Sequence, residues 1–151
     1  MRTKIILFLL VIFTFNAYTQ EALKILPLGN SITYDNNYED VDNPRPNGER
    51  ISYRYRLYQL LTDAGYTFDF IGSENGGGTY FPDTQNGGFP GISIEELNGI
   101  LNNGVWGGSQ ITPGAYLNTY VPDIILLHIG TNNISANPSD VSTHISYLMI
   151  F

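Results

Sequence analysis

The chain contains no cysteine, and few of its residues are charged. The absence of cysteine excludes disulfide scaffolds, zinc–thiolate sites and cysteine nucleophiles. Only 7 lysines and arginines stand against 14 aspartates and glutamates in 151 residues. A large basic patch is therefore not available, and binding to nucleic acid is disfavoured. The chain is still 42% hydrophobic and 13% aromatic, which is too apolar for a disordered protein and predicts one folded domain.

The first twenty residues have the order of regions found in a secretory signal peptide. Arg2 and Lys4 precede an apolar run at residues 5–15, and the small residues Ala17 and Thr19 follow it. A membrane-spanning helix needs about 20 apolar residues, so this run is too short to be one. We therefore predict a cleavable signal peptide at residues 1–20, a domain at residues 21–151, no membrane anchor, and a secreted or periplasmic location. The alternative is a buried N-terminal helix or strand.

The rest of the chain alternates between short apolar runs and segments with helical spacing. The predicted strands are residues 24–28, 67–71 and 123–129, and the predicted helices are 49–64, 93–101 and one that starts at 137–140. Ser93 and Glu96 have the spacing of a capping box at a helix start. Residues 35–48 and 73–91 are predicted as loops, and residues 104–122 as irregular with a short helix near 115–119. This alternation is typical of an α/β fold with a parallel sheet, and the unbroken apolar run at 124–127 favours burial on both faces.

Polar loops follow the predicted strands at the points where an α/β sheet binds its ligands. Residues 29–33 and 130–133 come directly after the first and third strands, and residues 88–91 come after the second. The carboxyl ends of parallel strands meet at one edge of the sheet. A serine hydroxyl, glycine amides and a carboxamide would therefore lie together there. Those groups suit nucleophilic attack on a carbonyl with hydrogen-bond donors around the developing oxyanion.

Three sequence blocks carry a resemblance to a known family. LPLGNSIT at 26–33, GFPG at 88–91 and PDIILLHIGTNN at 122–133 resemble blocks of the SGNH, or GDSL-type, hydrolases. The run from 53 to 73 also resembles the acetyl-xylan-esterase-like carbohydrate esterases. The resemblance implies a flavodoxin-like three-layer α/β/α sandwich with a parallel sheet. It also implies that Ser31 is the nucleophile, with Ser31 N–H, Gly91 N–H and the Asn132 amide as oxyanion donors, and it implies no cofactor and no metal.

Simpler roles are open for each of these residues. Ser31 could cap the helix that follows it, Gly91 could be a turn glycine, and Asn132 could be a structural turn residue. The chain also departs from the family pattern at two positions. Asn30 stands where the family commonly has aspartate, and Asn133 stands where the third block commonly ends in aspartate. Asparagine keeps the shape and hydrogen bonds of aspartate without its charge.

The family's catalytic base is a histidine in an Asp-x-x-His block, and the chain has no such spacing. His128 lies in an apolar run and is expected near the core, and His144 follows Asp140 with one residue too many. We therefore expect the block to lie beyond residue 151, so that residues 21–151 form only the N-terminal part of an incomplete fold. Such a chain should be poorly active and poorly stable, and the strand at 124–129 should lie at an exposed sheet edge.

The expected function is that of an exported serine ester hydrolase that removes acetyl groups from carbohydrate. Its partner would be a small-molecule or polysaccharide ester. The alternatives are a non-catalytic carbohydrate-binding remnant, an esterase or lysophospholipase that acts on lipid esters, and a nucleotide or flavin binder. The last is disfavoured because Asn30 and Ser31 stand where a phosphate-binding loop would be expected. The acidic loop at 35–42 could hold calcium, but a solvated surface loop is favoured.

Overall fold

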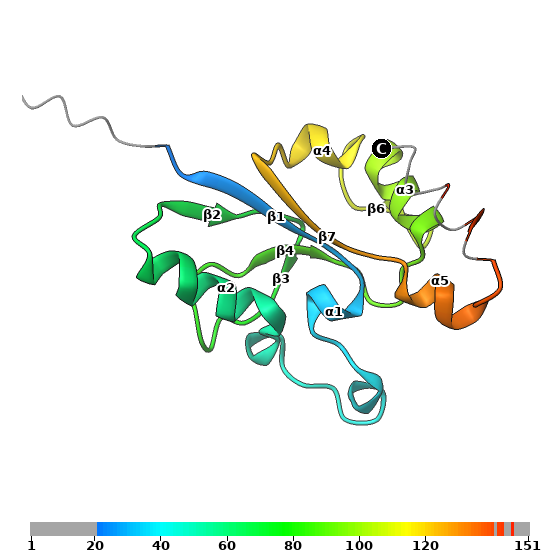
Figure 1. Cartoon of the computed structure of the whole chain (residues 1–151), viewed down its shortest axis with the longest axis horizontal. Coiled ribbons are helices and arrows are strands. Elements are labelled where there is room, and N and C mark those ends of the chain that lie inside the picture. The colour runs from blue at the N-terminus through cyan, green and yellow to red at the C-terminus, as the bar shows by residue number, and fades with distance from the viewer. Residues whose placement is uncertain (1–20, 141, 144–145, 147–151) are drawn as a thin grey trace, which may run out of the picture.

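A central parallel sheet organises the chain, as Figure 1 shows. The computed structural model describes residues 21–140, 142, 143 and 146. Strand β1 (Leu23–Gly29) pairs in parallel with β2 (Phe68–Phe70), with β4 (Gln85–Gly88) and with β7 (Ile124–His128). The fold class is therefore α/β with a mainly parallel sheet, and this prediction is confirmed.

Strand β1 has different partners along its two edges. Ile25 lies opposite both Phe70 of β2 and Ile124 of β7, so β2 and β7 flank β1 on opposite sides. Leu28 lies opposite Gly87 of β4, and β7 again takes the other side. Strands β2 and β4 therefore share one edge of β1, one after the other. Among the three strands predicted from the sequence, the spatial order is second, first, third.

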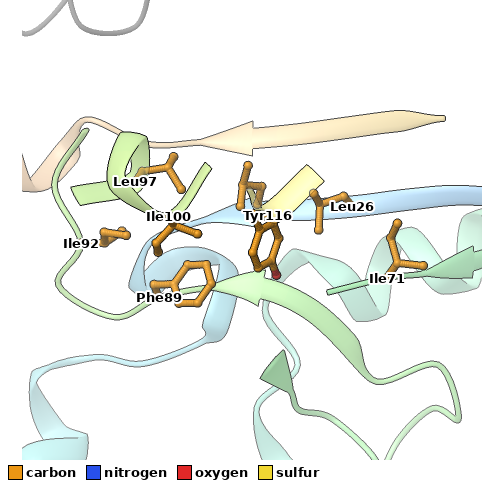
Figure 2. Packing of buried hydrophobic residues seen from close by; sticks show 8 residues of the cluster. Leu26, Ile71, Phe89, Ile92, Leu97, Ile100 and Tyr116 are labelled. Carbon is orange, nitrogen blue, oxygen red and sulfur yellow. The ribbon is translucent and has the colours of Figure 1, made fainter. Parts of the chain in front are cut away.

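Helices cover both faces of the sheet (Figure 1). On one face lie α1 (Ser31–Tyr34) and α2 (Ser52–Asp63), and on the other lie α3 (Ile94–Asn103) and α4 (Tyr116–Thr119). Each face has its own hydrophobic cluster because the side chains of β1 alternate. Ile25 packs with Phe70 and Phe81 beneath α2, whereas Leu26 and Leu28 pack toward α3 and α4. Figure 2 shows the second cluster, in which Phe89 and Tyr116 fill the space between the sheet and Leu97 and Ile100 of α3.

Two predicted helices are confirmed, with small shifts at their ends. The capping box of α3 is present, since the Ser93 side chain accepts from Glu96 N and the Glu96 side chain accepts from Ser93 N. The helix predicted at 49–64 begins only at Ser52, because residues 47–49 form a separate 3-10 turn. The 35–48 loop also contains a 3-10 turn, Tyr38–Val41. The short helix near 115–119 is α4.

The sequence analysis missed four short strands and two short helices, α1, which begins within the predicted 29–33 loop, and α5 (Thr131–Ala136). The segment 73–91 holds β4 and its antiparallel partner β3 (Glu74–Asn75), and a second hairpin pairs β5 (Val105–Trp106) with β6 (Ser109–Gln110). Strand β4 has the sequence QNGG, which contains no apolar residue to reveal it. Helix α5 begins in the last residues of the third block, where 130–133 was predicted as a loop. Residues 137–140, predicted as a helix start, are not helical, and most of the helix expected after them lies outside the described residues.

The burial predicted for both faces of the third strand is wrong. Ile124, Ile125 and Leu127 of β7 are 40%, 41% and 48% exposed. Within the described residues β7 pairs with β1 alone, so its second edge has no strand beside it. The other expectation, an exposed apolar edge at this strand, matches the structure. The predicted signal peptide, residues 1–20, lies outside the described residues, and none of the described helices is long and apolar enough to span a membrane.

Candidate active site

Ser31 stands at the sharp junction between β1 and α1. The helix is capped by Asn30, whose side-chain oxygen accepts a 3.0 Å hydrogen bond from Ile32 N. Ser31 is therefore the first residue of the helix and not its cap, and the capping alternative for Ser31 is wrong. Residue 29, two positions before Ser31, must be glycine, because a Cβ there would lie 2.1 Å from the His128 carbonyl oxygen. In the described part of the chain no hydrogen bond involves the Ser31 hydroxyl, which leaves this group available for chemistry.

Asn30 joins the first block to the third. Its side-chain nitrogen donates a 2.6 Å hydrogen bond to Thr131 Oγ1, and its backbone N–H donates to the His128 carbonyl at 3.3 Å. The Asn30 side chain is fully buried. An aspartate at this position could make the same contact by accepting from the threonine hydroxyl, whereas asparagine donates to it. Asn30 therefore connects two loops of the site without a carboxylate.

The second block is fixed to the first through the backbone. Phe89 N donates to the Gly29 carbonyl at 2.8 Å, immediately after the last paired residue of β4. Gly91 follows two residues later with a φ of +82°, a conformation that L side chains rarely adopt. A Cβ at Gly91 would meet no atom within 4 Å. Glycine is thus required at 91 by backbone conformation, and the space beside it is open.

The third block reaches across to the second through its two asparagines. Asn132 Nδ2 donates to the Ile92 carbonyl at 2.9 Å, which places the Asn132 amide beside the residue that follows Gly91. Asn133 Oδ1 accepts from Ile94 N at 2.9 Å, and its Nδ2 donates to Glu95 Oε2 at 2.7 Å. The hydrogen bond to Glu95 explains the second departure from the family pattern, since an aspartate at 133 would face another carboxylate there.

These contacts bring Ser31, Gly91 and Asn132 to one edge of the sheet. Each residue follows the carboxyl end of a strand that pairs with β1 or is β1 itself, as the sequence predicts. The loops are held together by hydrogen bonds between the blocks, and not only by their place in the chain. The Asn132 amide has a second N–H besides the one that Ile92 accepts. The three catalytic roles themselves stay predictions.

Of the two histidines only His128 lies in the described residues, and it makes no hydrogen bond to Ser31 there. His128 ends β7, and its Nδ1 is buried without a hydrogen-bond partner. No hydrogen bond joins the His128 ring to the Ser31 hydroxyl among the contacts of the described residues. His144 lies outside the described residues. His128 is half-buried with an unpartnered Nδ1, so the expectation of a hydrogen-bonded residue near the core is met only in part.

Two carboxylates of the acidic loop after α1, Asp35 and Asp40, form an ion-pair network with two arginines, whereas Glu39 and Asp42 are exposed as the solvated-loop expectation requires. Arg45 bonds to Asp35 at 3.2 Å and to Asp40 at 2.9 Å, and the buried Arg50 lies 3.3 Å from Asp40. Hydrogen bonds from Arg45 hold the pKa of Asp40 well below its usual range. Burial would raise the pKa of Asp35, but bonds from Arg45 and from the amides of Ser52 and Ile51 outweigh it and lower the pKa. Within the described residues, no three acidic or histidine side chains cluster as metal ligands.

A wide groove in the described residues lies away from Ser31. Its volume is about 580 Å³, and it runs between the end of α2, β2 and the segment 82–85, with none of Ser31, Gly91 or Asn132 in its lining. Asp83, on its wall, accepts a 2.8 Å hydrogen bond from Phe70 N. Burial raises the pKa of Asp83 to about 6, and the nearby Asp69 adds to this rise.

Arg54 is the residue that the sequence analysis did not single out. It is the one fully buried side chain of α2, although it carries a charge. Its guanidinium donates to backbone carbonyls of Thr33, Arg50 and Gly76. A signal was present in the sequence, because Arg54 shares helical spacing with Leu57 and Leu61 on the face that packs on the sheet.

Comparisons with known proteins support the resemblance found in the sequence. A multidomain esterase from Ruminococcus flavefaciens is 34% identical over 137 residues, which covers 80% of this chain and 16% of that protein. The solved family 3 carbohydrate esterase of Clostridium thermocellum is 31% identical, with a TM-score of 0.60, over 86% of this chain and 56% of the other. A family 3 carbohydrate esterase from Talaromyces cellulolyticus has the same fold, with a TM-score of 0.55 and 22% identity over 85% of this chain and 53% of the other. No family model matches the chain.

The chain thus spans a sixth of the curated relative and a little over half of each of these solved structures. Its likeness to carbohydrate esterases holds in sequence and in fold, so the resemblance is confirmed. The α/β architecture with a mainly parallel sheet is the architecture of these neighbours.

Proposed function

We propose that this chain supplies the nucleophile and the oxyanion donors of a serine ester hydrolase that removes acetyl groups from carbohydrate. The observation that carries the proposal is the joining of three loops at the carboxyl edge of the sheet. Hydrogen bonds from Asn30 to Thr131, from Phe89 to Gly29 and from Asn132 to Ile92 connect these loops. The choice of a carbohydrate ester follows the names of the similar proteins.

In the proposed reaction, Ser31 Oγ attacks the carbonyl carbon of the ester. The C=O electron pair moves onto oxygen, and the oxyanion is stabilised by Ser31 N–H, Gly91 N–H and the Asn132 amide. Each such donor can contribute about 3–4 kcal/mol to transition-state stabilisation. The tetrahedral intermediate then expels the sugar alkoxide, which takes up a proton, and water hydrolyses the acyl-serine to release acetate.

The serine proton requires a general base, since an unassisted serine hydroxyl is a weak nucleophile. The resemblance predicts a histidine in an Asp-x-x-His block, and that spacing does not occur among the 151 residues. In this proposal the described residues supply the nucleophile and the oxyanion donors, but not the general base. Export through the predicted signal peptide is part of the same proposal, because a polysaccharide substrate lies outside the cell.

The test is the Ser31→Ala variant of the intact protein, assayed for hydrolysis of an aryl acetate. We expect the loss of activity with an unchanged circular dichroism spectrum. The matched control is Ser109→Ala, because Ser109 is an exposed serine in the β5–β6 hairpin. A Ser31→Ala variant with most of its activity would refute the assignment. An inactive wild-type protein that binds acetylated oligosaccharide would instead favour the carbohydrate-binding remnant.

A further inference from the structure

The segment that carries Ser31 is too short to hold its own position. Helix α1 has four residues, and isolated helices of fewer than about 12 residues are marginal in water. Its position must therefore come from contacts with the rest of the molecule. Thr33, two residues beyond Ser31, is the one residue of α1 that is buried, and it is fully buried.

Three consecutive residues at the start of α2 lie within hydrogen-bond distance of Thr33. Ser52 Oγ donates to the Thr33 carbonyl at 3.0 Å, and Arg54 Nε donates to the same oxygen at 3.1 Å. The Tyr53 hydroxyl lies 3.2 Å from Thr33 Oγ1, within hydrogen-bond distance. We call Ser52, Tyr53 and Arg54 the α2 clamp. The clamp engages the backbone and the side chain of Thr33 together, so it restricts both the position and the rotation of α1.

The guanidinium of Arg54 also reaches the segment that leads to Gly91. Its Nη1 donates to the Gly76 carbonyl at 3.0 Å and to the Thr84 carbonyl at 3.3 Å, directly before β4. Its Nη2 donates to the Arg50 carbonyl at 2.7 Å. One rigid, planar group therefore joins α1 to the hairpin of β3 and β4. A lysine ammonium could not make this set of bonds, because it lacks the fork of five donors.

The α2 clamp contains two energetically unfavourable features, a buried charge and a strained backbone. In the described residues Arg54 forms no ion pair with a carboxylate, and its buried charge is met by backbone carbonyls. Burying a charge without an ionic partner is unfavourable, and apolar residues usually fill such positions better. Ser52 has a φ of +46°, which is a strained conformation for a residue other than glycine. Such features concentrate where geometry must be precise.

We propose that the α2 clamp positions Ser31 for attack, with Arg54 as its central positioning residue. This inference rests on the proposed function, since it assigns the clamp to the same serine. A displacement of about 1 Å at a reacting group can cost a hundredfold in rate. Arg54 acts through Thr33 and the β3–β4 hairpin, and it does not touch the ester.

The test compares variants of the intact protein by aryl acetate hydrolysis and by amide hydrogen exchange. Arg54→Lys keeps the charge, Tyr53→Phe removes one hydroxyl, and Arg56→Met is the matched control on the same helix, where Arg56 is exposed and bonds only to Gln59. Thermal unfolding gives the folded fraction, so that kcat is expressed per folded molecule. We expect kcat to fall about tenfold or more for Arg54→Lys and severalfold for Tyr53→Phe, with KM changed much less.

Amide exchange separates positioning from general stability. The Tyr34 and Asp35 amides donate to the Asn30 and Ser31 carbonyls within and at the end of α1. In both clamp variants these two amides should exchange faster, while the Leu97 amide of α3 keeps its protection. A general loss of stability would instead speed exchange at all three amides.

The outcomes separate this inference from the proposed function. Wild-type kcat per folded molecule in Arg54→Lys and Tyr53→Phe, together with an inactive Ser31→Ala, would overturn the clamp alone. An active Ser31→Ala would overturn the proposed function instead. Should Arg54→Lys not fold, Tyr53→Phe decides the matter, because unchanged kcat and unchanged α1 exchange in that variant would refute the clamp.

Discussion

Asn30 and Thr131 are 101 positions apart in the sequence, yet the Asn30 side-chain nitrogen donates to Thr131 Oγ1 at 2.6 Å. The same asparagine caps α1 through its oxygen. One buried amide thus uses its donor on the third block and its acceptor on the helix of the proposed nucleophile. A carboxylate, which the similar hydrolases commonly have at this position, is not needed here because the Asn30 amide makes both contacts.

Asn30→Ala should destabilise the protein by about 1–3 kcal/mol, since it removes a helix cap and the hydrogen bond that the buried Asn30 amide donates to Thr131. Urea unfolding of the whole chain measures this change. Asn118→Ala, at an exposed asparagine of α4, is the control and should change the free energy of unfolding by less than about 0.5 kcal/mol. Equal effects of the two substitutions would contradict the role given to Asn30.

Asn132→Ala should lower kcat for aryl acetate hydrolysis by about a hundredfold or more, with a smaller change in KM. The amide acts on charge that develops in the transition state, so its loss spares substrate binding. Steady-state kinetics of the intact protein measure both parameters, and Asn118→Ala again serves as the control. A change confined to KM would place Asn132 in substrate binding and not in the oxyanion site.

Asp83→Asn should stabilise the protein at neutral pH. The pKa of Asp83 is raised to about 6 in the folded state, against a usual value near 4. Between pH 4 and pH 6 the unfolded chain loses this proton more readily, so the stability contribution of Asp83 falls across that window. Because Asp83 is only partly buried, the gain in the variant above pH 6 should be about 1 kcal/mol.

Urea unfolding at pH 4, 5, 6 and 7.5 measures this difference between Asp83→Asn and wild type. The asparagine oxygen can still accept the hydrogen bond from Phe70 N. Asp63→Asn, at an exposed aspartate of α2, is the control and should show no such pH-dependent difference. A constant offset for Asp83→Asn over the whole pH range would show that the raised pKa is not its cause.

Leu127→Lys should reduce self-association of the chain. Leu127 is 48% exposed on β7, whose outer edge pairs with no strand in the described residues. A charge on an open apolar strand is one of the ways in which proteins block edge-to-edge pairing. Sedimentation velocity over a range of concentrations measures association, and Val121→Lys, which is exposed outside β7, is the control. A wild-type chain that stays monomeric throughout would contradict the prediction.

The parts that the sequence predicts are those in which local chemistry decides the structure. The apolar runs of β1 and β7 and the Ser93–Glu96 capping box are visible in a single stretch of chain. Strand β4 is not, because its QNGG sequence pairs only through the register that β1 imposes on Gly87 and Gly88. Arg54 has the helical spacing of a buried position, but the sequence does not show what would stabilise a charge there. Its burial depends on carbonyls from segments that come together only in the fold.

Strand β1 pairs with β2, β4 and β7, so every loop of the candidate site takes its register from the same seven residues. A single-residue insertion ahead of Leu26 would turn Leu26 and Leu28 to the opposite face and move Gly29 by about 3.3 Å against both neighbours. The surface hairpin at Gly107 and Gly108 sets the register of no loop of the site, and a Cβ at either glycine would meet no atom within 4 Å. Insertions and deletions should therefore be tolerated very unevenly along this chain. The length of β1 should be fixed, whereas the length of the β5–β6 hairpin should be free to vary.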